Sequence, residues 1–260
     1  MDESVFQAFL PELVDIRRRL HQMPETGYEE RQTSALVADL MEGWGLTVTR
    51  GLAATGFVAT LDRGGDRAVG LRADMDGLPI VEETGAVYAS RIPGMMHACG
   101  HDGHTTMLIG AAFRLIHDDD FRGKVHFIFQ PAEETAGGAA RMIEEGLFER
   151  FPCEAVFALH NYPGLATGRF SARTGAMMAA IDAATLTVRG RGGHGARPED
   201  TIDPVVAASS IVMALQSAIS RNVPPQEAGV ITVGAFHAGS ACNVIPDEAV
   251  LEISLRATDP

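Results

Sequence analysis

A short polar segment, residues 97–104, concentrates side chains that can bind a metal ion. It reads HACGHDGH, with Cys99 and His101 two positions apart and a glycine between them. Residues two apart in an extended segment point to the same side, so thiolate and imidazole could meet one ion. A cysteine nucleophile with a histidine base is the alternative, but immediate neighbours rarely adopt the geometry that such a pair needs. Nearby acidic residues raise the pKa of a thiol, which disfavours a free thiolate nucleophile, whereas a divalent cation removes the thiol proton outright. We therefore favour the metal site.

A pair of adjacent carboxylates, Glu133 and Glu134, is the second candidate. Adjacent side chains diverge, so one carboxylate could bind an ion while the other exchanges a proton with water. His160 could supply a further nitrogen ligand for zinc, manganese or a similar divalent ion. Asp74 and Asp76 could orient a histidine ligand, or they could only cap their own loop.

These candidates lie where an α/β sheet would place a binding site. Asp74, Glu133 and His160 each follow a short apolar run that is typical of a buried strand. Open α/β sheets bind ligands outside the carboxyl ends of their strands. We therefore predict a catalytic domain over residues 1–177, with a mainly parallel sheet flanked by helices on both faces. Strands are expected at 57–61, 68–72, 125–129 and 155–159, and helices at 3–22, 31–44, 104–117 and 138–147.

A smaller lid domain is expected over residues 178–260. Its pattern predicts an α+β, ferredoxin-like sheet with one helix, from strands at 181–189, 230–236 and 249–257 and a helix at 203–220. His194, in a glycine-rich turn, could donate to a substrate oxygen, although a flexible turn alone would explain the glycines. Asn243 could bind a carboxylate or an amide. Because the chain stops directly after a strand, we expect it to be incomplete at the C-terminus.

Composition narrows the class of partner. The net charge of -13 argues against nucleic acid and anionic membranes, which both favour basic patches. The first residues do not form a secretory signal, and no apolar run is expected to span a bilayer. Three cysteines form no disulfide framework, which favours a reducing cytoplasm.

Six motifs, taken together and in order, resemble one family. That family is the amidohydrolase branch of the metal-dependent aminoacylase and carboxypeptidase (peptidase M20) family, which includes hippurate hydrolases and auxin-conjugate hydrolases. The motifs are RADMDGLP at 72–79, MHACGHDGHT at 96–105, QPAEE at 130–134, LH at 159–160, GGHGARP at 192–198 and NVIP at 243–246.

The resemblance implies a hydrolase with two divalent metal ions per subunit in the intact enzyme. It implies that water bridging the two ions attacks the amide bond of N-acyl or N-aroyl amino acids, with Glu133 as general acid and base. His194 would stabilise the oxyanion and Asn243 would help to bind the substrate. The lid of such proteins often makes homodimers. Matched residue by residue, the implied metal ligands are Cys99, His101, Glu134 and His160.

Members of the family continue beyond the point where this sequence stops. They return to the catalytic domain and add a strand and a further histidine ligand. The alternative hypothesis is therefore a truncated, inactive homologue that binds a metal or a ligand without turnover. A reading frame that continues beyond residue 260 and encodes a late histidine would favour the enzyme.

Overall fold

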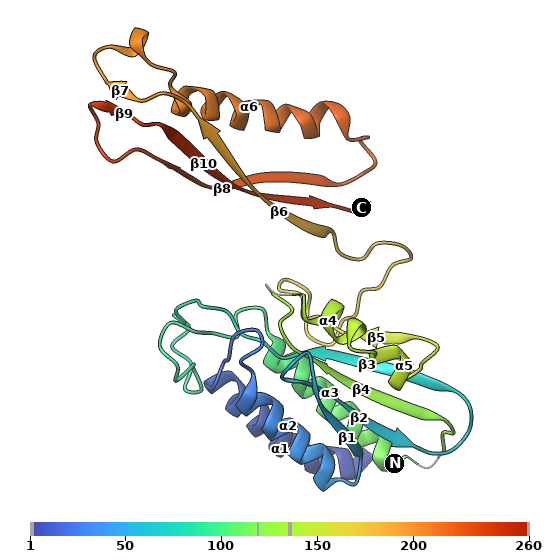
Figure 1. Ribbon diagram of the computed structural model, residues 1–260. Helices are drawn as coiled ribbons and strands as arrows, with labels where there is room; N and C mark the ends of the chain where they lie inside the picture. Colours follow the sequence, from blue (N-terminus) through green and yellow to red (C-terminus); the bar gives the residue numbers. More distant parts are fainter. Residues whose placement is uncertain (1–2, 119, 135–136, 259–260) are drawn as a thin grey trace. The chain divides into compact units, whose positions relative to one another are not determined.

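The computed structural model describes residues 3–118, 120–134 and 137–258 (Figure 1). The chain forms two compact units, Met1–Gly164 and Leu165–Pro260. The domain boundary predicted between residues 177 and 178 lies inside the second unit, in the irregular segment before its first strand.

The first unit is built on a five-stranded sheet. Its strands are β1 (Thr47–Leu52), β2 (Gly56–Asp62), β3 (Ala68–Asp74), β4 (Lys124–Gln130) and β5 (Val156–Ala158). They are ordered β1-β2-β4-β3-β5; β3 pairs in parallel with β4 and β5, whereas β2 pairs antiparallel with β1 and β4. The predicted α/β class is confirmed. The sheet is mixed because the short link between β1 and β2 permits only a hairpin, which the sequence pattern did not indicate.

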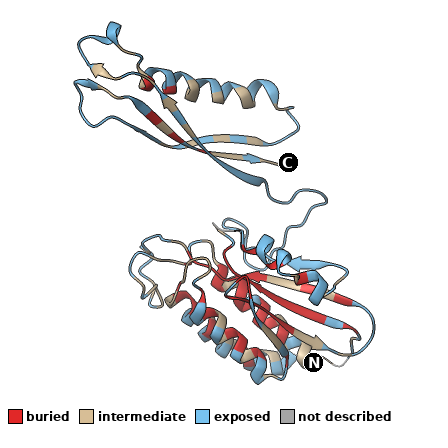
Figure 2. Ribbon diagram, in the orientation of Figure 1, coloured by how far each residue is buried: buried red, intermediate tan, exposed pale blue. Residues whose placement is uncertain are grey.

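Helices cover both faces of this sheet (Figure 1). They are α1 (Glu3–Gln22), α2 (Arg31–Gly43), α3 (His101–Ile116), α4 (Gly138–Glu144) and α5 (Leu147–Arg150). Phe57 and Phe127 enter the core shared with α1, α2 and α3, whereas Val58 and Ile128 enter the core shared with α4 and α5. Side chains alternate between the faces of a strand, so both faces of β2 and β4 are apolar. Figure 2 shows the resulting concentration of buried residues in the sheet.

The carboxyl ends of three parallel strands bring the candidate residues to one edge. β3, β4 and β5 run in the same direction, and their registers place Asp74 beside Gln130. The segments that follow them carry Asp76, the glutamate pair and His160. The sheet topology therefore gathers residues that are far apart in the sequence, as expected for an α/β site.

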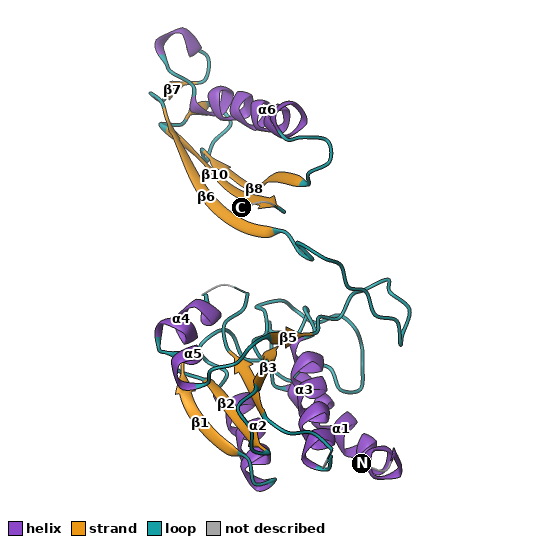
Figure 3. Ribbon diagram, turned by 90° about the vertical axis from the view of Figure 1, so that its right-hand side faces the viewer, coloured by secondary structure: helices purple, strands orange, loops and turns teal. Residues whose placement is uncertain are grey.

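The second unit is an antiparallel sheet with one long helix on it (Figure 3). The sheet has the order β6-β10-β8, from β6 (Ala180–Arg189), β8 (Gly229–Ala238) and β10 (Glu248–Ala257). Helix α6 (Pro204–Asn222) packs on it, so the predicted α+β elements are present. A two-stranded sheet of β7 (Gly193–His194) and β9 (Val244–Ile245), and a 3-10 helix at Pro198–Asp200, were not foreseen.

Helix α6 begins at a well-formed N-terminal cap. The Asp203 carboxylate accepts hydrogen bonds from the Val205 and Val206 amides at 2.8 and 3.3 Å, and Pro204 occupies the first helical turn. By length and composition α6 is the one described helix that could cross a membrane, which the sequence expectation had excluded. A helix that packs on the core of a globular protein can pass the same test, and α6 buries Ala208 against the sheet of its own unit.

Candidate metal centre

His101 is the centre of the site in the first unit. Gly100, with φ 86°, turns the chain so that α3 begins at His101; the segment expected to be a loop up to residue 104 is therefore helical from His101 onwards. The imidazole Nδ1–H donates to Asp76 Oδ1 at 3.0 Å, while the buried Nε2 has no hydrogen-bond partner among the described residues. A carboxylate behind one nitrogen and a free lone pair on the other is the usual arrangement of a metal-binding histidine.

Cys99 and His160 face the same region. The Cys99 sulfur lies 3.5 Å from His160 Nε2, and His160 Nδ1–H donates to the Asn161 carbonyl at 2.6 Å. The ligand atoms of Cys99, His101 and His160 all lie within 4.8 Å of one another. The structure thus brings Cys99 and His101 together as expected, but through a helix start and not through an extended segment.

The electrostatic surroundings of Cys99 do not suit a nucleophile. Burial raises the pKa of its thiol to about 12, and the carboxylates of Glu134, Glu133 and Asp74 add to the effect. A nucleophilic cysteine needs surroundings that lower its pKa. A divalent cation would supply the missing positive charge and remove the proton. The donor set therefore fits a metal better than it fits a cysteine hydrolase.

Glu133 and Glu134 lie beside His101 but differ in exposure. Glu134 Oε1 and Glu133 Oε2 are 3.7 and 3.9 Å from His101 Nε2, with side chains 22% and 42% exposed. Glu134 Oε1 is buried and lacks a hydrogen-bond partner among the described residues, as expected of an oxygen that is available to an ion. Burial raises the pKa of Glu133, which moves it toward the range useful for proton transfer.

Asp76 holds two of the candidate ligands at once. Besides accepting from His101 through Oδ1, it accepts the Glu134 backbone N–H through Oδ2 at 3.0 Å. Burial alone would raise the pKa of Asp76, but these hydrogen bonds and the nearby imidazole lower it. Asp76 is therefore an ionised carboxylate that fixes an imidazole and a main-chain segment together.

Asp74 performs a similar task for His104, a residue that the sequence reasoning did not single out. His104 Nδ1–H donates to Asp74 Oδ1 at 2.6 Å, and the Asn161 N–H donates to His104 Nε2 at 3.0 Å. Arg72 donates a further hydrogen bond to the other carboxylate oxygen of Asp74, Oδ2, at 2.8 Å. Asp74, His101 and His104 also form a group that could hold a metal ion, but both His104 nitrogens have hydrogen-bond partners, so we assign His104 to fastening the segment after β5 to α3. In the sequence, His104 could have been singled out by its position one helical turn after His101, on the same face of α3.

Asp102 forms a second buried network that the sequence reasoning missed. Its Oδ2 accepts from Arg17 Nε at 2.9 Å and from His21 Nδ1 at 2.8 Å, so α1 anchors the first turn of α3. The hydrogen bond with Asp102 raises the pKa of His21. His21 and Asp102 lie 81 residues apart in the sequence, so no local pattern indicates their contact.

The two candidates in the second unit lie next to each other. His194 in β7 pairs with Val244 in β9, and the Gly195 N–H donates to the Asn243 carbonyl at 2.8 Å. A Cβ on Gly195 would lie 2.9 Å from that carbonyl oxygen, so close packing requires this glycine. The structure therefore groups His194 with Asn243 and groups the other seven candidates in the first unit.

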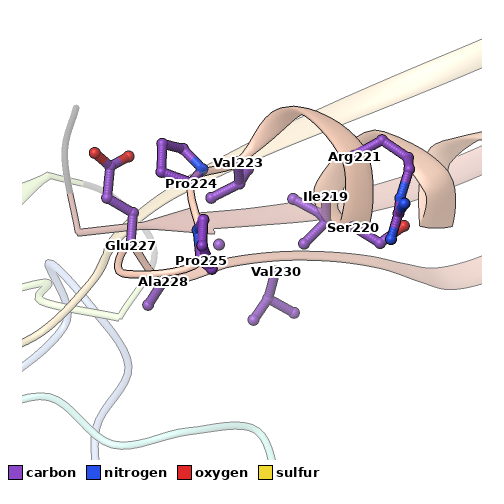
Figure 4. A pocket seen from close by; sticks show the side chains of 10 residues that line it. Ile219, Ser220, Arg221, Val223, Pro224, Pro225, Glu227, Ala228 and Val230 are labelled. Carbon is purple, nitrogen blue, oxygen red and sulfur yellow. The ribbon is translucent and has the colours of Figure 1, made fainter.

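A cavity of about 540 Å³ lies elsewhere in the second unit, beside the C-terminal end of α6 (Figure 4). Its charged lining residues are Arg221 and Glu227, which Figure 4 shows on opposite sides. Ile219, Val223 and Val230 supply apolar walls. Among the described residues, no histidine, cysteine or pair of carboxylates lines it, so these residues offer no counterpart to the chemistry around His101.

Residues 70–253 match the model of a known protein family, which is described as peptidase family M20/M25/M40. This chain belongs to that family. It is 46% identical over 258 residues to hippurate hydrolase of Campylobacter jejuni and 43% identical over 250 residues to N-acetyl-L-cysteine deacetylase of Bacillus subtilis. A solved Bacillus subtilis structure, described as a dinuclear metal-binding peptidase of the M20 family, matches with a TM-score of 0.77 and 34% identity.

These matches cover nearly all of this chain but only part of the M20 relatives. They include 96% of the chain for the hippurate hydrolase, 95% for the deacetylase and 96% for the solved structure. The chain in turn spans 67%, 60% and 65% of their lengths. The resemblance read from the motifs is thereby confirmed at the level of the family.

Proposed function

We propose that the chain carries the catalytic machinery of a divalent-metal-dependent amidohydrolase that acts on N-acyl amino acids. The observation that carries the proposal is a pair of buried ligand atoms, His101 Nε2 and Glu134 Oε1, which have no hydrogen-bond partner among the described residues and lie beside Cys99 and His160. Buried polar atoms are almost always hydrogen-bonded. His101 Nε2 and Glu134 Oε1 lie 3.7 Å apart, next to a thiol and a further imidazole. This arrangement supports a cation between them.

Cys99, His101, Glu134 and His160 would hold the ions. Thiol and imidazole donors suit zinc, and the carboxylates also permit manganese. Two divalent ions per subunit agree with the dinuclear description of the solved relative. When bound, such ions lower the pKa of water and polarise a carbonyl group.

Glu133 is the proton carrier in this proposal. Its carboxylate lies next to the ligands but is the more exposed of the glutamate pair, so it can reach both water and substrate. It accepts a proton from the water as the new carbon–oxygen bond forms, and it donates that proton to the nitrogen as the carbon–nitrogen bond breaks. One carboxylate thus serves both halves of the hydrolysis.

His194 and Asn243 would contact the substrate. An imidazole that donates to the developing oxyanion is worth about 3–4 kcal/mol in related chemistry. Asn243 would bind the substrate carboxylate or amide. The substrate class is supported by the relatives, whose names specify hippurate and N-acetyl-L-cysteine, both acylated amino acids.

Location and assembly form a separate part of the proposal. We place the protein in the cytoplasm, which is supported by three free cysteines. A homodimer through the second unit is supported by the exposed edge strands β6 and β8, which offer unpaired backbone groups.

The test is hydrolysis of a panel of N-benzoyl and N-acetyl amino acids by the metal-stripped chain, with and without added zinc or manganese. The proposal predicts turnover that a chelator abolishes and the metal restores. Metal binding without turnover would favour the truncated binding protein instead. Loss of turnover on alkylation, with no effect of chelators, would favour a cysteine nucleophile.

A further inference from the structure

We infer that Glu30 is a positioning residue for Glu133. This inference rests on the proposed function, since it concerns the residue that carries the proton. Glu30 precedes α2, and its side chain is hydrogen-bonded to Thr55 and Ala132, neither of which is a candidate ligand. It acts on the main chain immediately before Glu133, through Ala132.

Glu30 is a fully buried carboxylate with two specific partners. Its Oε1 accepts the Ala132 N–H at 2.8 Å, and its Oε2 accepts the Thr55 hydroxyl at 2.5 Å. A buried carboxylate is costly unless hydrogen bonds compensate its desolvation. The contact with Ala132 spans 102 residues of sequence, so it joins the start of α2 to the end of β4.

The turn that Glu30 holds has an unfavourable backbone. Ala132 has a φ of 50°, a left-handed conformation that residues with a Cβ rarely adopt. The turn is also closely surrounded: a Cβ on Gly56 would lie 2.7 Å from Pro131 Cδ, and one on Gly138 would lie 1.8 Å from the Pro131 oxygen. Such a conformation persists only where its surroundings impose it.

Glu133 is consequently fixed from both sides. Glu30 holds the amide of Ala132, and Asp76 holds the amide of Glu134 at 3.0 Å. Removing the Glu30 contact frees one side and allows the strained turn to relax. A displacement of a reacting group by about 1 Å can lower the rate about 10²-fold.

Four variants separate positioning from simple stabilisation. Glu30→Ala removes both hydrogen bonds, whereas Glu30→Gln keeps an acceptor for Ala132 and a partner for the Thr55 hydroxyl. Thr55→Val removes only the second hydrogen bond. Glu29→Gln is the matched control, because Glu29 is adjacent and 64% exposed. Each is compared with wild type for kcat, KM, zinc affinity by chelator competition, and unfolding midpoint.

We expect Glu30→Ala to lower kcat about 10²-fold with KM and zinc affinity nearly unchanged, and Glu30→Gln to recover most of that loss. Thr55→Val should lower the unfolding midpoint while kcat stays near the wild-type value. The inference is overturned if folded Glu30→Ala retains wild-type kcat. It is also overturned if Thr55→Val loses as much kcat as Glu30→Ala, since the loss would then follow stability.

If the wild-type chain shows no turnover, the proposed function is refuted. The contact between Glu30 and the turn is then tested by a second measurement that does not depend on activity. Hydrogen exchange of the peptide that contains Ala132 and Glu133 then decides. Faster exchange in Glu30→Ala but not in Glu30→Gln supports the hold on the turn. Equal exchange in both variants and wild type overturns it.

Discussion

Replacing Asp76 by asparagine should weaken metal binding without unfolding the protein. Asp76 accepts two hydrogen bonds, from His101 Nδ1 at 3.0 Å and from the Glu134 N–H at 3.0 Å. An asparagine side chain has one acceptor oxygen, and its amide group would face one of these donors. Either the His101 ring or the Glu134 main chain must therefore shift, and both belong to the proposed ligand set.

The size of the effect follows from the role of such contacts. Removing a carboxylate behind a metal-binding histidine typically lowers metal affinity 10- to 100-fold, which corresponds to about 1.4–2.7 kcal/mol. Asp76 supports two ligands, so we expect Asp76→Asn to lie near the upper end, with about 100-fold weaker zinc binding. An effect confined to one ligand would lie near the lower end.

The assay is competition for zinc against a chromophoric chelator, together with urea unfolding of the metal-free chain. The exposed Asp15 provides a matched control, and Asp15→Asn should bind zinc like wild type. Wild-type zinc affinity in folded Asp76→Asn would refute the assignment of His101 and Glu134 as ligands. Equal weakening in Asp15→Asn would show that overall charge, and not ligand orientation, sets the affinity.

Three further predictions concern stability and reactivity. The raised pKa of His21 means that protonation of its imidazole stabilises the fold fully below about pH 6.5, and that this contribution is lost as the pH rises through the raised value. The difference in unfolding free energy between wild type and His21→Gln should therefore shrink as the pH rises, and a difference that does not change with pH would contradict this. With its pKa raised to about 12, Cys99 of the metal-free chain should react with iodoacetamide more slowly than the exposed Cys242, as peptide mass spectrometry can show; faster reaction at Cys99 would revive the nucleophile hypothesis. Phe57→Ala should lower the free energy of unfolding in urea by about 3–5 kcal/mol, because Phe57 is fully buried, whereas Val87→Ala at a 95% exposed position should change it little.

The elements of the fold were largely predictable because their apolar patterns are local. The run at 57–61 became β2, and the helical spacing over 3–22 became α1. The strand β1 was missed because TVTRGL has few apolar residues and only Leu52 is buried. The direction of β2 was also beyond local reasoning, since strand direction depends on which neighbours pair.

The grouping of Cys99, His101, the glutamate pair and His160 was predictable because their residue types suggest chemistry, whereas the contacts that support them were not; the roles of these residues stay predictions. Cys99 stands two residues before His101, and Glu133 and Glu134 follow a predicted buried strand, which is where an α/β sheet places a binding site. Glu30, just before α2, and Asp102, in the first turn of α3, by contrast look like ordinary acidic residues at the start of a helix. Their hydrogen-bond partners lie far away in the sequence, so these contacts form only after the sheet and helices have assembled.

The central claim is that Glu133 carries the proton while its neighbours hold the metal. The most direct test is turnover of an N-acyl amino acid by Glu133→Gln, with bound metal measured in the same sample. Loss of a general acid and base lowers rates by about 10²–10⁴-fold, so we predict a drop of that size with unchanged metal content. Glu133→Gln that retains wild-type turnover, or that loses its metal together with its activity, would contradict the account.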